Sequence, residues 1–341
     1  MIAPIGREIR LARRPQGDPK ITDFEVAEAT PAPPPGAGQV QLKVRWISVD
    51  PMIRIFIDAR PLGGAGNPLP IGSVVPGPAL AEVIASEHPD FMVGDHVEGR
   101  IGWREFATVQ PAGLRKVDPA HGALSAQLGV LGLPGFSAYV GLGLLGDLGP
   151  GKSLLISGAG GAVGSVAGPL AKLRGARTIG IAGGEARCRA LVDELGYDVA
   201  LDRRAADFPE RLAEAAGAGF DAYFENVGGD IFDLALPHLR RGGQVVICGL
   251  MAQYGGGGEA ATDRLPATLL TIMRQGLTVR AFSNTEHRGL LAPFHAEVGA
   301  LLATGKLPSP EHVAEGFEAT PDAFCRLFTH SVLGKSLVRV A

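Results

Sequence analysis

Three glycines spaced three residues apart carry the first chemical signal in this sequence. Gly158, Gly161 and Gly164 follow an apolar run at residues 153–157 and precede an alanine- and leucine-rich segment. In a turn between a strand and a helix, such glycines let the backbone bend tightly and approach a pyrophosphate, which the helix N-terminus attracts. The pattern predicts a dinucleotide site, and a plain loop is the alternative in a chain with 49 glycines.

Arginines beyond the next two expected strands indicate which dinucleotide binds. The strand at residues 177–182 is followed by Gly183 and Arg187, and the strand at residues 198–202 is followed by Arg203. A site for NAD usually has an acidic residue at the end of the second strand. Arginines there would instead form charge-assisted hydrogen bonds with the 2′-phosphate of NADPH. The alternative is that both arginines are solvated surface charges.

From residue 119 onward, expected strands alternate with expected helices, and this alternation would position the glycines and arginines. Strands separated by helices at this spacing form a doubly wound parallel sheet with right-handed crossovers. We therefore predict an α/β fold with a Rossmann domain at residues 119–299. The expected strands are residues 153–157, 177–182, 198–202, 221–225, 243–248 and 277–282.

The first part of the chain has a different pattern. Residues 1–118 contain several short strands separated by turns rich in glycine and proline, which predicts a partly closed antiparallel β-barrel. The strand expected at residues 334–340 has no obvious place in the parallel sheet. We therefore expect residues 300–341 to return to this first domain.

Composition excludes several classes of protein. The 341 residues are enough for two domains, and the net charge of −3 gives no basic field that would attract nucleic acid. The three cysteines have no pairing or zinc-binding spacing, which fits a reducing cytoplasm, and we see no signal peptide. The uncharged stretch at residues 122–146 is long enough to cross a bilayer, but Pro134 and its glycines favour a buried helix and turn. We expect a cytoplasmic protein without a membrane partner.

A catalytic zinc ion is disfavoured. Such an ion needs three protein ligands, usually histidine or cysteine with an acid. The sequence has no cysteine before Cys188, and His88, His96 and His121 stand in unrelated settings. We therefore expect no metal.

Several short motifs in order along nearly the whole chain resemble one family. Together they resemble the zinc-independent medium-chain dehydrogenases/reductases, and within them the leukotriene hydroxydehydrogenase, prostaglandin reductase and curcumin reductase group. The motifs are SVDP at residues 48–51, VLGLPG at 130–135, AY at 138–139, GAVGS at 161–165, ENVGG at 225–229, ICG at 247–249, Tyr254, and GK at 334–335.

The resemblance implies a GroES-like barrel domain beside a Rossmann domain, and NADPH-dependent reduction of the carbon–carbon double bond of enones and enals. It also implies a homodimer. In the family, a lysine and a tyrosine that hold the 2′-phosphate occupy the positions of Arg187 and Arg203. The expected cofactor contacts are Gly161, Ala162, Val163, Gly164, Gly183, Arg187, Arg203, Asn226, Cys248, Gly249, Leu250, Tyr254, Phe282, Ser283 and Asn284.

The implied reaction needs a hydrogen-bond donor rather than a nucleophile. Hydride attacks the β-carbon, negative charge grows on the carbonyl oxygen, and a donor must stabilise that charge. Tyr254 is the candidate catalytic donor and substrate contact, although it could equally be an aromatic wall of the pocket. Met52 is the other candidate substrate contact, at a position where the family has a tyrosine. The glycines at residues 255–258 form a candidate lid.

Two other functions remain open. A quinone reductase of the same superfamily would share the fold and the cofactor and would give a one-electron product. A non-enzymatic NADPH-binding sensor or scaffold would bind the cofactor without turning over any activated alkene.

Overall fold

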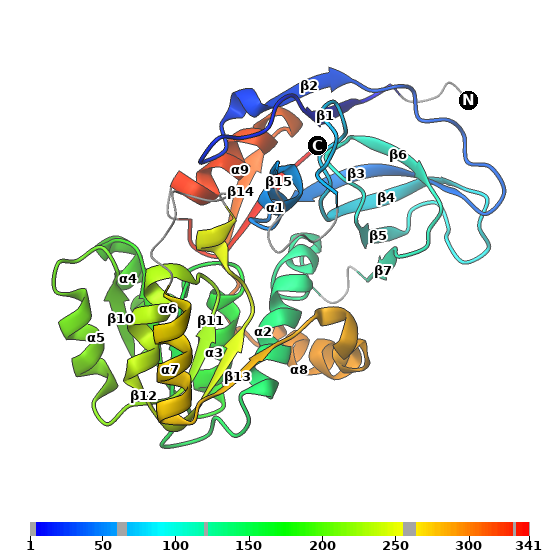
Figure 1. The fold of residues 1–341 in the computed structure, drawn as a ribbon. Coiled ribbons are helices and arrows are strands. Elements are labelled where there is room, and N and C mark those ends of the chain that lie inside the picture. The colour runs from blue at the N-terminus through cyan, green and yellow to red at the C-terminus, as the bar shows by residue number, and fades with distance from the viewer. Residues whose placement is uncertain (1–4, 60–66, 119–121, 255–263, 330–331, 341) are drawn as a thin grey trace.

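The computed structural model describes residues 5–59, 67–118, 122–254, 264–329 and 332–340, and these residues form two lobes (Figure 1). One lobe contains a six-stranded sheet with helices around it, and the other contains a seven-stranded sheet and a two-stranded sheet. The predicted fold class, a doubly wound α/β unit beside a β-rich unit, is confirmed.

The six-stranded sheet has the order β10-β9-β8-β11-β12-β13, and all its neighbouring strands are parallel. The order runs outward in both directions from β8, as in a doubly wound sheet. Its strands are β8 (Ser153–Ile156), β9 (Arg177–Ala182), β10 (Val199–Asp202), β11 (Phe220–Glu225), β12 (Leu239–Ile247) and β13 (Thr278–Ala281).

Helices cover both faces of this sheet. Successive residues of β8 point to opposite faces, so Leu154 and Ile156 join one hydrophobic cluster and Leu155 joins another. All three side chains are fully buried, as is usual for a parallel strand between two helical layers. The helices are α2 (Leu133–Leu144), α3 (Gly164–Leu173), α4 (Glu185–Asp193), α5 (Phe208–Ala216), α6 (Gly229–Ala235), α7 (Leu265–Gln275) and α8 (Leu291–Ala303).

The seven-stranded sheet has the order β14-β15-β3-β4-β5-β7, with β6 paired to β3, and it does not close into a barrel. Its pairs are antiparallel except that β14 and β15 are parallel. The strands are β3 (Val40–Ser48), β4 (Ala79–Ser86), β5 (His96–Gly99), β6 (Phe106–Val109), β7 (Arg115–Val117), β14 (Glu311–Glu315) and β15 (Lys335–Arg339). Beside them lie β1 (Arg7–Leu11), β2 (Phe24–Glu28), α1 (Ile53–Ile57) and α9 (Thr320–Thr329).

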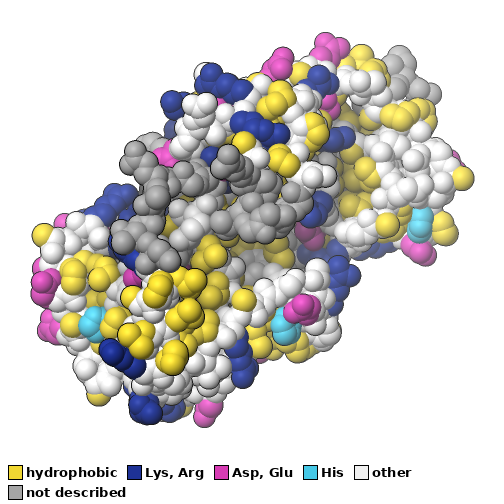
Figure 2. All heavy atoms as spheres, viewed as in Figure 1, with side chains coloured by type: hydrophobic (Ala, Val, Ile, Leu, Met, Phe, Trp, Pro, Cys, Tyr) yellow, Lys and Arg dark blue, Asp and Glu magenta, His cyan; other side chains and the backbone are white. Residues whose placement is uncertain are grey.

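The two lobes are joined directly at the glycine turn. The Gly334 N–H donates to the Gly160 carbonyl oxygen at 2.8 Å, and a parallel bridge pairs Gly161 with Gly334. Because β15 continues from Gly334 to pair with β3, the carboxyl edge of the parallel sheet faces the lobe that contains the seven-stranded sheet. Figure 2 shows a hollow between the two lobes on the viewed face.

The uncharged stretch at residues 122–146 forms the short 3-10 helix η4 (Leu124–Leu128) and the α-helix α2. Most side chains of α2 are buried against the parallel sheet and α3. None of the helices in the described part of the chain is both long enough and apolar enough to cross a membrane.

Candidate active site

The glycine turn follows β8 and precedes α3. Gly158 has φ of 58°, a left-handed conformation that favours glycine, and its carbonyl oxygen accepts from the Gly161 N–H at 2.9 Å. A Cβ at Gly164 would lie 2.6 Å from the Gly158 carbonyl oxygen and from the Ala159 Cα. The turn is therefore too tight for larger residues at these positions, as a cradle for phosphates requires.

A cavity of about 280 Å³ lies beside this turn, at the carboxyl edge of the sheet. Its walls come from the glycine turn, the ends of β11 and β12, the turn after β3 and the segment before β15. The structure thus brings together residues that are distant in sequence. The sequence-predicted site residues that line it are Met52, Gly161, Ala162, Val163, Gly164, Arg187, Asn226, Cys248, Gly249 and Tyr254.

Other predicted contacts lie outside this cavity. Asn284 lines a neighbouring cavity of about 340 Å³, and its Nδ2 donates to the Ser137 Oγ at 2.7 Å. The two cavities share Met52 and Leu133, so they are adjacent. The cofactor contacts at Gly183, Arg203, Leu250, Phe282 and Ser283 line neither cavity and stay predictions. The candidate lid at residues 255–258 lies outside the described residues.

Arg187 is the main cation of the cavity. Its Nη2 donates to the Val332 carbonyl oxygen, whereas its buried Nε has no partner among the described residues. Burial lowers the pKa of Arg187 to about 10, and repulsion from Arg204 and then Arg203 adds to the effect. A half-buried cation repelled by two others indicates a site for a strongly negative group.

Arg204 is a member of this cluster that the sequence prediction missed. A Cβ at Gly183 would lie 3.1 Å from the Arg204 Nε and 3.3 Å from the Arg203 Nε, so both side chains pass close to the end of β9. Asp202 holds the turn, since its Oδ1 accepts from the Gly184 N–H at 2.7 Å and the Arg204 N–H at 2.9 Å. The sequence signal that could have revealed Arg204 was a second arginine directly after the third predicted strand.

A buried glutamate at the end of β11 holds the part of the cavity wall that contains Asn226. The sequence prediction gave this glutamate no role. Glu225 is fully buried, and its Oε1 accepts from the Ser157 Oγ at 2.8 Å and the Gly228 N–H at 2.7 Å. The Tyr223 hydroxyl and the Val227 N–H also donate to this carboxylate. These bonds fix the turn that presents Asn226.

Asn226 is itself held by the end of β8. Its backbone N–H donates to the Ser157 Oγ at 2.8 Å, and its Nδ2 donates to the Ser157 carbonyl oxygen at 2.8 Å. The end of β8 and the turn after β11 are therefore connected to each other by several hydrogen bonds. An acid that ends an apolar strand before two glycines is the sequence signal that could have revealed this arrangement.

Tyr254 and Cys248 give the cavity two neutral side chains. Burial raises the pKa of the Tyr254 hydroxyl, so the group remains a protonated donor at neutral pH. Its Oη lies 3.3 Å from the Leu250 nitrogen, whose N–H donates to it. Burial, and then the Glu225 carboxylate, raise the pKa of the Cys248 thiol to about 12. The cavity can donate hydrogen bonds but does not offer a thiolate nucleophile.

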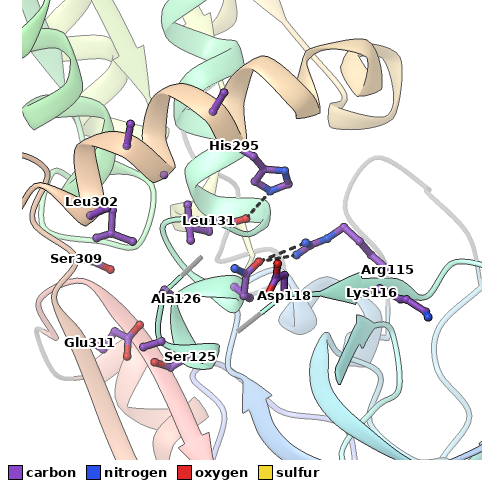
Figure 3. Close-up of a pocket in the computed structure, with 17 residues that line it drawn as sticks. Arg115, Lys116, Asp118, Ser125, Ala126, Leu131, His295, Leu302, Ser309 and Glu311 are labelled. Atoms are coloured by element: carbon purple, nitrogen blue, oxygen red, sulfur yellow. Dashed lines mark hydrogen bonds between the residues drawn. The ribbon is translucent and has the colours of Figure 1, made fainter. Parts of the chain in front are cut away.

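A larger cavity, of about 1020 Å³, lies elsewhere. It lies between α8, η4 and the start of β14, away from the glycine turn (Figure 3). Its polar side chains already have protein partners, because Arg115 donates to the Gln127 Oε1 and the His295 Nε2 contacts the Leu131 carbonyl oxygen at 3.1 Å. We therefore place the candidate active site at the smaller cavity.

Metal ligands do not gather in the described ranges of the chain. No group of three or more histidine, cysteine, aspartate or glutamate side chains lies there close enough to hold an ion.

Comparison with known proteins agrees with this geometry. The family model described as the N-terminal domain of oxidoreductase matches residues 7–117, and the one described as zinc-binding dehydrogenase matches residues 162–290. The chain is 36% identical to the NADPH-dependent curcumin reductase of Escherichia coli, over 97% of this chain and 96% of the relative. The chain belongs to the medium-chain dehydrogenases/reductases.

Further relatives place the chain within that family. It is 32% identical to prostaglandin reductase 1 of Rattus norvegicus, over 96% of this chain and 97% of the relative. The crystal structure of CurA from Vibrio vulnificus in complex with NADPH matches with a TM-score of 0.91 and 36% identity, over 98% of this chain and 99% of that chain. Medium-chain reductases of the curcumin and prostaglandin reductase group are therefore similar to this protein along its whole length.

Proposed function

We propose that this protein uses NADPH to reduce the carbon–carbon double bond of α,β-unsaturated ketones and aldehydes. The cavity at the glycine turn carries the proposal, because it has a half-buried cation at Arg187 and a neutral donor at Tyr254. The relatives named as NADPH-dependent curcumin reductase and prostaglandin reductase 1 support the same reaction class.

The residues of the cavity fit NADPH. The glycine turn and the first N–H groups of α3 would hold the pyrophosphate, since a Cβ at Gly164 would clash with the turn. Arg187, Arg203 and Arg204 would hold the 2′-phosphate, which would give the buried Arg187 Nε a partner. A dianion would also offset the mutual repulsion of the three arginines.

NADPH, when bound, supplies the hydride that adds to the β-carbon of the substrate. Tyr254 donates its hydroxyl hydrogen bond to the carbonyl oxygen as negative charge develops there, and a proton is added at the α-carbon to complete the reduction. The Glu225 network keeps Asn226 in place and the Met52 side chain borders the substrate side. Orientation of the reactants accounts for much of the rate, about 7–11 kcal/mol in favourable cases.

The decisive experiment is NADPH oxidation measured against a panel of enones, enals and quinones. We expect turnover with the enones and enals, with saturated ketones and aldehydes as products. Turnover only with quinones, with a one-electron product, would favour the quinone reductase. Tight NADPH binding without turnover of any activated alkene would favour a sensor or scaffold.

We also propose that the protein is a cytoplasmic homodimer. The edge strand β13 has a partner on one side only, and four apolar side chains of the adjacent α7 are exposed: Leu265, Leu269, Leu270 and Met273. Figure 2 shows hydrophobic side chains gathered over this helix. Light scattering should give about twice the chain mass of 35.3 kDa, and a mass equal to one chain would contradict the proposal.

We also propose that the chain divides into two domains. Residues 1–118, with residues 300–341 returning to them, form the GroES-like domain, and residues 119–299 form the Rossmann domain. The pairing of β15 with β3 supports the assignment of the last residues to the first domain. Limited proteolysis should cleave first near residue 118 and between α8 and β14, because residue 299 itself lies within α8.

A further inference from the structure

The Ser336 hydroxyl is a buried polar group that lines the candidate active site. Ser336 is 3% exposed, and its Oγ has no hydrogen-bond partner among the described residues. About 90% or more of buried polar groups in proteins have a partner, so an exception in a cavity wall needs an explanation. Ser336 has no part in the cofactor contacts, substrate contacts or catalysis proposed for this cavity.

The backbone around Ser336 is held by the side chain of Lys335, which points to the opposite face of β15 from the Ser336 side chain. The Lys335 Nζ donates to the Asp50 Oδ1 at 3.1 Å, the Ser336 carbonyl oxygen at 2.9 Å and the Val49 carbonyl oxygen at 2.9 Å. The Ser48 hydroxyl donates to the Asp50 Oδ2 at 2.6 Å. These bonds use all three ammonium protons and fix the backbone beside Ser336.

We propose that the Ser336 hydroxyl is a recognition point for a hydroxyl group of the bound ligand. The ligand hydroxyl would donate to or accept from the Ser336 hydroxyl, which gives this buried group a partner. Two ligands can bring such a group: NADPH through a ribose hydroxyl, or a hydroxylated enal. Naming these two ligands rests on the proposed function, whereas the unpaired hydroxyl does not.

Ser336→Ala separates this role from a structural one. A serine that stabilises the fold loses a hydrogen bond when it becomes alanine, so the melting temperature falls. A serine whose hydroxyl is unpaired in the ligand-free protein loses nothing, and removal of the buried hydroxyl leaves the melting temperature unchanged or higher. Alanine also fits the space of serine, so the variant should fold.

Two binding measurements distinguish the ligands. Fluorescence titration gives the Kd of NADPH without substrate, and steady-state kinetics give KM for 4-hydroxynon-2-enal and for non-2-enal. Loss of one neutral hydrogen bond should raise the affected constant about two- to ten-fold. A raised Kd identifies the ribose, and a raised KM for the hydroxylated enal alone identifies the substrate. Ser336→Cys, which keeps a weak donor, should give a smaller effect.

Ser125→Ala is the matched control, because Ser125 is also buried but lines the larger cavity instead. It should change neither constant. The proposal is overturned if Ser336→Ala leaves the NADPH Kd and both KM values unchanged, or if it lowers the melting temperature without changing them. If the wild type binds NADPH but reduces no enal, the proposed function fails, and the Kd comparison still tests the hydroxyl site.

Discussion

At the scale of single residues, Arg187 links the sequence to the choice of cofactor. Arg187→Ala should raise KM for NADPH about ten-fold or more, because one charged hydrogen bond to the 2′-phosphate is worth about 1.5–3 kcal/mol. KM for NADH should barely change, since NADH lacks that phosphate. Steady-state kinetics with both cofactors test this.

Arg189→Ala is the control for that experiment. Arg189 lies on the same helix but forms an exposed ion pair with Glu185 at 2.7 Å, so its loss should leave both KM values unchanged. Equal weakening of NADPH and NADH by Arg187→Ala would show that the arginine is structural.

A second prediction concerns Tyr254 and the dependence of kcat on pH. Burial raises the pKa of its hydroxyl above the ordinary value of about 10, so the group ionises at a higher pH than an exposed tyrosine. We expect any loss of kcat from Tyr254 ionisation to begin only above the pH at which an exposed tyrosine ionises. Tyr254→Phe should lower kcat by about 10²–10³, as removal of one oxyanion donor does. A Phe variant with wild-type kcat would identify Tyr254 as an aromatic wall.

Much of the site could be predicted from the sequence because its signals are local. The glycine spacing and the motif after β11 marked Gly161, Gly164 and Asn226, which line the cavity. Ser336 gave no such signal, since its unpaired hydroxyl depends on how β15 approaches the turn after β3. Burial and missing partners are properties of tertiary packing and cannot be read from spacing.

At the scale of elements, helix α3 packs against Tyr197, which lies in the chain after α4. Substitution of Gly168 in α3 tests this packing. A Cβ at Gly168 would lie 2.0 Å from the Cζ of Tyr197, a side chain that is 2% exposed. Gly168→Ala gains about 1 kcal/mol of helix propensity, but overpacking costs about 1–3 kcal/mol or more. We expect a lower free energy of unfolding, measured by urea denaturation.

Gly143→Ala provides the matched control in α2. A Cβ there has no heavy atom within 4 Å, so only the helix propensity changes. This variant should gain up to about 1 kcal/mol of stability. If both variants gain stability, Tyr197 can move aside and the close approach of α3 is not required.

The strands of the parallel sheet were the most predictable elements, because each is a short apolar run bounded by turns. The predicted bounds of residues 177–182 agree with β9. The strand β14 and the helix α9 escaped prediction. The residues of β14 are half-buried or exposed and carry no clear alternation, and this strand depends on pairing with β15.

At the scale of the whole molecule, one buried ion pair connects the end of β3 to β15. Lys335 and Asp50 have side-chain exposures of 4% and 15%. Lys335→Met should lower the free energy of unfolding by about 3–5 kcal/mol, because it leaves a largely buried carboxylate without its cation. Chemical denaturation measures the change.

Lys172→Met tests whether this cost is specific to the buried pair. Lys172 pairs with Asp198 at 2.9 Å, but 44% of its side chain is exposed, so its loss should cost about 1 kcal/mol or less. Similar losses for the two variants would mean that the Lys335 pair contributes no more than an exposed ion pair.

The hydrogen bond from Lys335 to the Val49 carbonyl oxygen spans 286 residues of the chain. Translation therefore makes β3 long before β15, its neighbour in the finished sheet, and the whole parallel sheet is synthesised between them. The end of β3 at residues 46–48, which pairs with β15, therefore has to wait for this partner, and an unpaired strand edge can pair with other chains. The cleft for the dinucleotide is completed last, since Gly334 reaches the glycine turn only after nearly all of the described chain has emerged.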